Sequence, residues 1–172
     1  LPKSLNSSET PLFHKRTTLY GLHQAKECIR KADRVVVVEG YLDVIALTQH
    51  ELSYAVATLG TALTVDHIRL LSRYTKNVIA LFDGDDAGQK AAARSFEVFV
   101  EAGLLGRAAF LPKQDDPDTF VRRHGKARLE LILDEAVPLA DFFFLWLERR
   151  YGKSLEGKSQ IAAEVSRVLA KL

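Results

Sequence analysis

Sulfur-containing residues are nearly absent from this 172-residue sequence. It has no methionine, not even at position 1, and no signal peptide precedes its first strand-like run, so we expect a piece of a longer chain. Its single cysteine, Cys28, excludes an intramolecular disulfide bond and a cysteine zinc cluster. These absences are typical of a protein from a reducing, intracellular compartment.

Long hydrophobic runs are also missing. The most apolar stretch, residues 142–147, is bracketed by Asp141 and Glu148 and is far shorter than the roughly 18 residues of a membrane span. Hydrophobic residues make up 47% of the chain and charged residues 27%, which are the proportions of a soluble globular protein. We therefore expect one domain of ordinary size, with room for a small appendage, and no membrane partner.

A strong excess of one charge is the third absence, because 24 basic residues oppose 22 acidic ones and leave a net charge of +2. The distribution is nevertheless uneven: residues 1–34 carry +4, residues 35–118 carry −5 and residues 119–172 carry +3. Scatter over a solvated surface is the simplest interpretation of these differences. The positions of the acids in the middle segment favour a functional interpretation instead.

Short β-branched runs alternate with stretches of helical spacing along the chain. The run 35–38 consists of four valines, which is typical of a strand buried on both faces of a parallel sheet. Further strands are expected at 54–57, 78–82 and 107–111. Helices are expected at 21–32, 41–50, 65–74, 86–102, 117–136, 138–150 and 159–171. The alternation predicts an α/β fold, with a mainly parallel sheet of about four strands flanked by helices and a C-terminal helical appendage that lacks strands.

Acidic residues follow three of the four expected strands. Glu39 follows the first strand, and Asp43 comes four residues later. The sequence Asp83-Gly84-Asp85 closes the third strand, and Asp116-Pro117-Asp118 comes after the fourth. Because the ligand crevice of an open α/β sheet lies outside the carboxyl ends of its strands, we expect these carboxylates to meet at one edge.

A group of carboxylates without a neighbouring histidine or cysteine is the donor set that a hard cation prefers. Oxygen ligands favour Mg²⁺ or Mn²⁺ over zinc, and a cation also relieves the repulsion between like charges. Taken singly, each acid has another interpretation. Asp85, Asp86 and Asp116 are suited to helix starts, and Glu39 could simply end a strand. Their coincidence at one edge favours a metal site.

The same acids follow a family pattern. Glu39 and Asp83-Gly84-Asp85 resemble the Toprim domain, which has a Glu after its first strand and an Asp-x-Asp after its third. Longer strings resemble bacterial replicative DNA primases of the DnaG type: residues 39–43, 57–61, 83–88 and 116–119, together with the N-terminal segments 2–15 and 19–22. The resemblance runs in order over about residues 2–145. Ser8 and Arg16 stand where the family commonly has Pro and Gly.

The resemblance implies a Toprim catalytic core fragment in three parts. Residues 1–34 correspond to the end of a basic N-terminal subdomain and the helix that leads into the core, residues 35–116 to the Toprim α/β domain, and residues 117–172 to a C-terminal helical subdomain. The implied activity is DNA-directed RNA primer synthesis, a nucleotidyl transfer that releases pyrophosphate, in the bacterial cytoplasm at the replication fork. The implied partners are a single-stranded DNA template, ribonucleoside triphosphates, the RNA primer and, through a C-terminal domain missing here, the replicative helicase.

The resemblance also assigns site residues. The catalytic positions are Glu39, Asp83 and Asp85. The ligands for two or more Mg²⁺ or Mn²⁺ ions are Glu39, Asp43, Asp83, Asp85, Asp116 and Asp118, and the role of Glu39 as ligand or general base stays open. The nucleic-acid contacts at matching family positions are Lys3, Asn6 and Lys15. Tyr41 is a further candidate because it lies beside the acids, where it could pack against a nucleotide or simply pack as an aromatic on the sheet edge. Zinc is expected only in a domain outside this chain.

Two other functions fit the same residues. A Toprim nuclease or topoisomerase would also use the acids for phosphoryl transfer, although a topoisomerase needs a nucleophilic tyrosine from another domain. A non-catalytic Toprim module would bind DNA or partners, but it need not retain a complete acid set. Residues 152–159 formally fit a P-loop, but a P-loop follows a buried strand, whereas a helix is expected before this segment.

Overall fold

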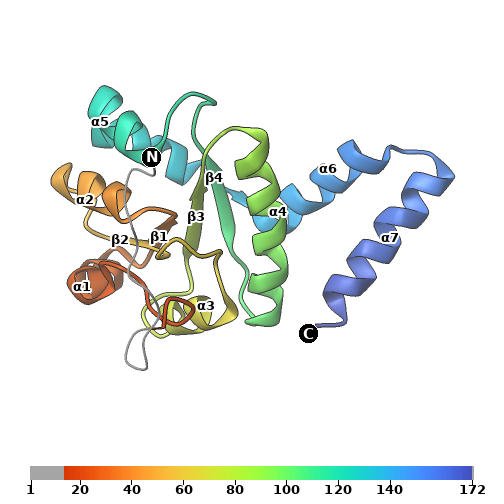
Figure 1. Cartoon of the computed structure of the whole chain (residues 1–172), viewed down its shortest axis with the longest axis horizontal. Coiled ribbons are helices and arrows are strands. Elements are labelled where there is room, and N and C mark those ends of the chain that lie inside the picture. Colours follow the sequence, from red (N-terminus) through yellow and green to blue (C-terminus); the bar gives the residue numbers. More distant parts are fainter. Residues whose placement is uncertain (1–13, 172) are drawn as a thin grey trace.

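A five-stranded sheet forms the centre of the molecule (Figure 1). The computed structural model describes residues 14–171, so Lys3 and Asn6 lie outside the described residues. The strands are β1 (Val35–Val38), β2 (Ala55–Ala57), β3 (Val78–Phe82), β4 (Arg107–Phe110) and β5 (Val137–Pro138). The sheet order is β2-β1-β3-β4-β5, in which β1 to β4 are parallel and β5 is antiparallel to β4. The predicted, mainly parallel α/β sheet is confirmed.

Helices flank this sheet. They are α1 (Leu22–Ala32), α2 (Tyr41–Gln49), α3 (Val65–Leu71), α4 (Asp86–Glu101), α5 (Pro117–Asp134), α6 (Leu139–Tyr151) and α7 (Leu155–Leu169). Helix α2 packs against β2 and α5, whereas α3 packs against α4. Helix α6 packs against α4, and α7 lies at the far end of the molecule from the sheet (Figure 1). Within residues 14–171, no helix combines the length and the apolar character that crossing a bilayer requires.

The sequence of the two central strands explains their position. The four valines of β1 are each at most 4% exposed, and all five residues of β3 are buried. Strand β1 lies between β2 and β3, and β3 lies between β1 and β4. Strands with neighbours on both sides and helices over both faces bury every side chain, which is why these runs are apolar without alternation.

The C-terminal part contains a strand that was not expected. Val137 and Pro138 form β5 between α5 and α6, with Val137 paired to Ala108 of β4. A pairing of two residues is too short to produce a periodic pattern in the sequence, so the expectation of helices without an intervening strand was wrong.

Two helix boundaries also differ from the expected ones. Helix α7 begins at Leu155 rather than at residue 159, because the Ser154 side chain accepts a hydrogen bond from the Gly157 N–H at 3.1 Å and caps the helix. Gly125, with φ of 75°, interrupts α5, which was expected to be continuous. Helix α6 precedes residues 152–159, so the strand that a P-loop requires is missing there, as predicted.

Helix α5 is tied to the first half of the chain by a polar cluster. The Arg34 guanidinium, at the start of β1, forms ion pairs with Glu130 and Asp134 of α5. The Tyr54 hydroxyl donates a hydrogen bond to Glu130 at 2.7 Å and accepts one from Arg34 at 2.8 Å. These contacts connect α5 to the residues that precede β1 and β2, on the side of the sheet where α5 packs against α2. The domain boundary at residues 116–117 stays a prediction.

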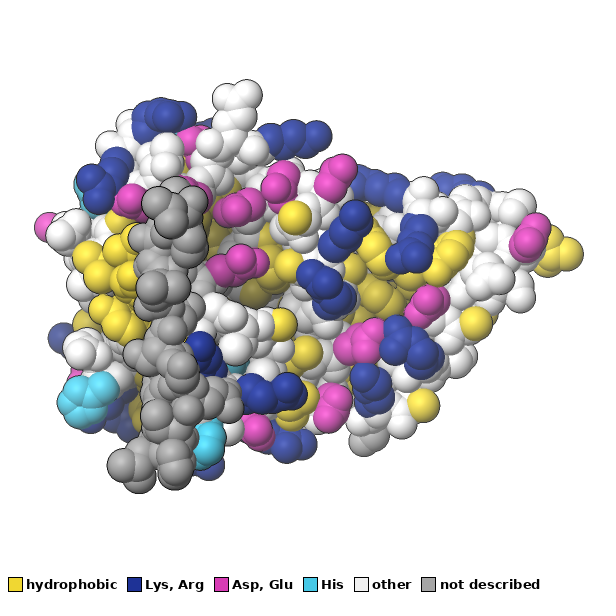
Figure 2. Space-filling model, in the orientation of Figure 1, with side chains coloured by type: hydrophobic (Ala, Val, Ile, Leu, Met, Phe, Trp, Pro, Cys, Tyr) yellow, Lys and Arg dark blue, Asp and Glu magenta, His cyan; other side chains and the backbone are white. Residues whose placement is uncertain are grey.

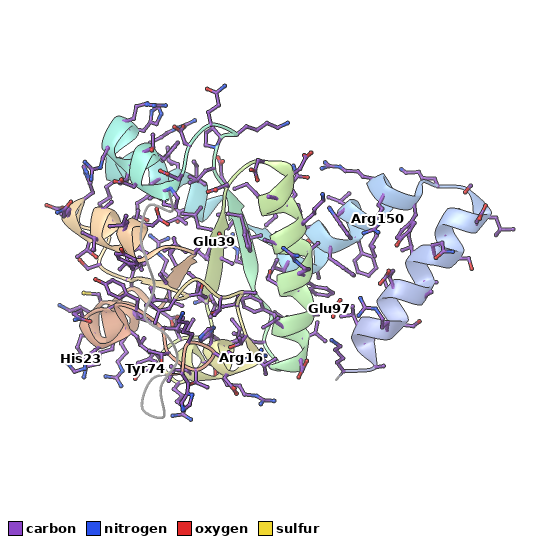
Figure 3. All side chains as sticks on the ribbon, in the orientation of Figure 1. Arg16, His23, Glu39, Tyr74, Glu97 and Arg150 are labelled. Atoms are coloured by element: carbon purple, nitrogen blue, oxygen red, sulfur yellow. The ribbon has the colours of Figure 1, made fainter. Side chains whose placement is uncertain are left out.

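Helices α6 and α7 attach to the core through α4. The rings of Phe96 on α4 and Phe143 on α6 lie 4.7 Å apart, centroid to centroid. Glu97, which points from α4 toward α7 in Figure 3, forms ion pairs with Arg167 and Lys171. An aromatic contact and an ion-pair cluster therefore hold the C-terminal helices against the side of α4.

Candidate metal and phosphoryl-transfer site

The topology brings the first two predicted acids together. Glu39 follows β1 and Asp83 follows β3, and these strands are neighbours in the sheet. From β1 the chain moves outward to β2 and then returns to the other side of β1 to form β3, so the two acids lie at the switch point of the strand order. Figure 3 shows Glu39 between α2 and α4, and its side chain is exposed.

The turn after β3 requires glycine at two positions. A Cβ on Gly84 would lie 1.9 Å from the carbonyl oxygen of Leu111, and a Cβ on Gly88 would lie 2.0 Å from that of Asp83. Both obstacles are backbone atoms, which cannot rotate away. Asp85 caps α4, because its side chain accepts a hydrogen bond from the Gly88 N–H at 2.7 Å. The turn is therefore packed directly against the loop that follows β4.

The start of α5, which follows that second loop, carries two more of the predicted acids, whereas Asp43 lies in the first turn of α2. Asp116 caps α5 by accepting a hydrogen bond from the Thr119 N–H at 2.7 Å. Asp118, in the first turn of α5, forms an ion pair with Arg122. The interpretation of Asp85 and Asp116 as caps is thus correct, but a cap uses one carboxylate oxygen and leaves the other for a ligand.

The pKa values show that the acids interact. The pKa of Asp43 is raised from 3.8 to about 6. Burial is the largest cause, the charges of Asp116 and Asp83 add to the rise, and hydrogen bonds from the Gly40 and Asp118 N–H groups oppose it. Burial also raises the pKa of Asp83, and the charges of Glu39, Asp85 and Asp116 add to that rise. These carboxylates repel one another in the protein alone, which is the condition that a cation relieves.

The side chains do not form a complete cation cage as they stand. Among residues 14–171, no group of three His, Cys, Asp or Glu side chains is arranged to hold an ion. The donor set nevertheless fits a hard cation, since it consists of carboxylates alone. The Glu39 and Asp83 side chains make no hydrogen bond or ion pair with another described residue. Mg²⁺ completes its coordination with water and substrate phosphates, so a partial protein shell suits it.

The predicted nucleic-acid contacts have different surroundings. The Tyr41 ring, at the start of α2, lies 5.8 Å from the ring of Tyr20 at an angle of 58°. The Lys15 carbonyl accepts a hydrogen bond from the buried His67 ring at 2.9 Å, and the Thr64 hydroxyl donates one to the Arg16 carbonyl at 2.7 Å. The start of α3 therefore fixes the backbone that carries Lys15.

Hollows border the acidic edge on the side of α4. One of about 530 Å³ includes Glu39 in its lining, and another of about 600 Å³ includes Asp85. The second hollow is also lined by Lys90, Arg94 and Lys113, which sequence reasoning did not select. The spacing of four residues between Lys90 and Arg94, directly after the Asp-Gly-Asp turn, was the signal that could have found two of them.

The sequence of residues 36–121 matches the Toprim-like family, and the chain therefore belongs to that family. The curated proteins that it resembles include DNA primases. It is 46% identical to a DNA primase of Salmonella typhimurium over 166 residues, which cover 94% of this chain and 29% of that protein. The chain thus spans less than a third of the length of this relative.

Solved primase structures share the fold. A DNA primase domain from Pseudomonas aeruginosa superposes with a TM-score of 0.91 at 44% identity, over 100% of this chain and 55% of that one. A DnaG primase catalytic domain bound to single-stranded DNA superposes with a TM-score of 0.89 at 42% identity, over 99% of this chain and 56% of that one. The similarity extends through α6 and α7, beyond residues 36–121.

Proposed function

We propose that this chain is the catalytic core of a bacterial replicative primase, which synthesises RNA primers on a single-stranded DNA template. The observation that carries the proposal is the set of mutually repelling carboxylates around Asp83, at the switch point of a Toprim-like sheet. The similarity to DNA primases selects nucleotidyl transfer among the reactions that such a site supports. A non-catalytic module would have no use for these costly charges.

The acids would hold divalent cations, and we favour two or more Mg²⁺ or Mn²⁺ ions. The proposed ligands are Glu39, Asp43, Asp83, Asp85, Asp116 and Asp118. Such ions, when bound, supply positive charge that stabilises the attacking and leaving oxygens and the triphosphate. Asp85 and Asp116 would each offer the carboxylate oxygen that does not cap a helix, and Asp118 would offer the oxygen that does not contact Arg122.

The proposed reaction is an in-line displacement at phosphorus. The 3′-hydroxyl oxygen of the growing RNA forms a bond to the α-phosphorus of the incoming ribonucleotide, and the bond between that phosphorus and the pyrophosphate oxygen breaks. The hydroxyl proton passes to a base or to solvent. Glu39 is exposed at the end of β1 and has no hydrogen-bond or ion-pair partner among residues 14–171, so it is available as that base or as a ligand.

The remaining partners follow from the same proposal. Lys15 and Tyr41, together with Lys3 and Asn6, would contact the template and the primer, with lysine binding phosphates without regard to sequence. The substrates would be ribonucleoside triphosphates. The setting would be the bacterial cytoplasm at the replication fork. The replicative helicase would bind through a C-terminal domain of the whole protein, and zinc would bind in a separate domain.

Template-dependent incorporation of ribonucleotides by the intact protein, with Mg²⁺ or Mn²⁺, tests the proposal. We expect Asp83→Asn and Glu39→Gln to lose activity, because each removes a charge from the acidic edge. Glu101→Gln is the matched control, since Glu101 is exposed at the other end of α4, roughly 24 Å from its start. Full activity in both site variants would refute the assignment, and DNA cleavage in place of RNA synthesis would favour a Toprim nuclease.

A further inference from the structure

Three positively charged side chains surround the hollow of about 600 Å³ next to the acidic edge. They are Lys90 and Arg94 on α4 and Lys113 in the loop after β4, and all three are exposed. None of them forms an ion pair or a side-chain hydrogen bond with another residue of the range 14–171. We call these residues the cationic row. Two carboxylates, Asp85 and Asp86, line the same hollow without forming an ion pair with any of the three cations.

Nearby arginines behave differently. Arg122 and Arg123 on α5 form ion pairs with Asp118 and Asp115, and Arg167 on α7 pairs with Glu97. Not every arginine is paired, since Arg149, which lines another hollow together with Lys113, forms no ion pair with a described residue. The cationic row is distinguished by its place next to the acidic edge, where a negatively charged ligand would approach.

The spacing of the row fits a chain of phosphates better than one compact anion. Lys90 and Arg94 stand on successive turns of one face of α4, roughly 6 Å apart along the helix axis. Lys113 comes from a different element and lines the same hollow. Cations spread along a surface, rather than converging on a point, are typical of a groove that follows a nucleic-acid backbone.

Arg94 connects this hollow with two others. It also lines the hollow that contains Glu39 and a smaller one, of about 170 Å³, between α4, α6 and α7. The smaller hollow includes Trp146 and Arg150, whose guanidinium lies 5.2 Å from the centroid of the Trp146 ring. Figure 2 shows dark blue side chains over α4 and α6, beside the magenta acids near the start of α4. A basic surface next to an aromatic ring thus continues away from the acids.

We propose that the cationic row binds the phosphate backbone of a single-stranded nucleic acid and directs the strand across α4 to the acidic edge. The proposal rests on the proposed function, because it takes the strand as the substrate of that edge. Arg94 can contact a phosphate through two N–H groups, whereas Lys90 and Lys113 act as point charges. Such contacts hold the strand without reading its sequence.

Binding of a fluorescent oligothymidylate to the intact protein, in EDTA and at several salt concentrations, tests this proposal. Each phosphate contact contributes about 0.7 to the slope of log K against log[salt]. The triple variant Lys90→Gln, Arg94→Gln, Lys113→Gln should therefore lower the slope by about 2 and weaken binding roughly 10–100-fold at 0.1 M salt. The charge-matched control is Arg73→Gln, Lys76→Gln, Arg128→Gln, three exposed cations outside the row, which should change neither.

Each outcome decides the proposal. An unchanged slope in the row variant, or an equal loss in the control variant, would overturn it. It would also fail if the row variant kept its oligothymidylate affinity but lost affinity for inorganic pyrophosphate, since the row would then bind a compact polyphosphate. Arg94→Lys keeps the charge and should retain the slope, so a general folding defect is recognisable. If the wild type binds through the row but incorporates no ribonucleotide, the proposed function fails while the row stands.

Discussion

Replacing Asp43 by asparagine should make the metal-free protein more stable at neutral pH. In the wild type, burial and neighbouring carboxylates raise the pKa of Asp43 from 3.8 to about 6. The folded protein therefore binds this proton more tightly than the unfolded chain does. The resulting stabilisation is complete below pH 3.8, is lost as the pH rises through about 6, and is absent at pH 7.5, where Asp43 is ionised. Asparagine removes that charge and keeps an oxygen for the Gly40 N–H, which lies 3.1 Å from the carboxylate.

The size of the effect follows from the pKa. A rise from 3.8 to about 6 corresponds to ~3 kcal/mol for a fully shielded charge, at 1.36 kcal/mol per pH unit. The Asp43 side chain is only half-buried, and solvent screening reduces this value to ~1–2 kcal/mol. For a chain of this length, 1 kcal/mol changes the midpoint of thermal unfolding by about 2–4 °C. We therefore expect Asp43→Asn to melt about 2–8 °C higher than the wild type at pH 7.5 in EDTA.

Thermal unfolding at pH 7.5 and pH 4, with and without Mg²⁺, measures this difference. The advantage of Asp43→Asn should shrink at pH 4, where the wild-type carboxyl is protonated in the folded state. Mg²⁺ should stabilise the wild type more than the variant. Equal melting of the two proteins at pH 7.5, or an advantage of the same size at both pH values, would refute the reasoning.

Three further predictions concern residues that hold the site in place. Gly84→Ala should lower the unfolding midpoint by roughly 2–12 °C, from about 1–3 kcal/mol of overpacking against Leu111; an unchanged midpoint in calorimetry would contradict it. Tyr54→Phe removes the hydrogen bond to Glu130, so urea titration should show a loss of about 1 kcal/mol or more, and no loss would mean that water replaces the contact. Burial lowers the pKa of His67, and its Nδ1 accepts a hydrogen bond from the Thr64 N–H. NMR should therefore find that this ring has a pKa below 6.5, and the wild type should lose stability as the pH falls below 6.5; a ring pKa at or above 6.5 would disprove this.

The sheet and the position of the acids were predictable because one physical pattern determines both. An unbroken apolar run such as Val35–Val38 is typical of a strand in a sheet that is covered on both faces. Parallel strands place their carboxyl ends at the same edge of the sheet. Glu39 and Asp83 each directly follow a strand of this kind, so they lie close together if the two strands are neighbours in the sheet. The strand order itself comes from the structure, because periodicity does not contain it.

Other features depend on contacts that no local pattern records. Strand β5 exists because Val137 meets Ala108 of a distant strand, and Arg34 selects Glu130 from a helix almost a hundred residues away. The cap at Ser154 is a local feature, because serine is a common N-cap residue, and it places the start of α7 before the predicted residue 159. That Lys90 is unpaired could be learned only from the fold, because pairing depends on what lies opposite.

Binding of Mn²⁺ to the intact protein, followed by electron paramagnetic resonance, tests the central claim most directly. The claim is that the carboxylates around Asp83 form the cation site at the sheet edge. We predict that Asp83→Asn weakens Mn²⁺ binding at least about tenfold, while Glu101→Gln, at the far end of α4, binds as the wild type does. Equal Mn²⁺ affinity in Asp83→Asn and the wild type would contradict the account.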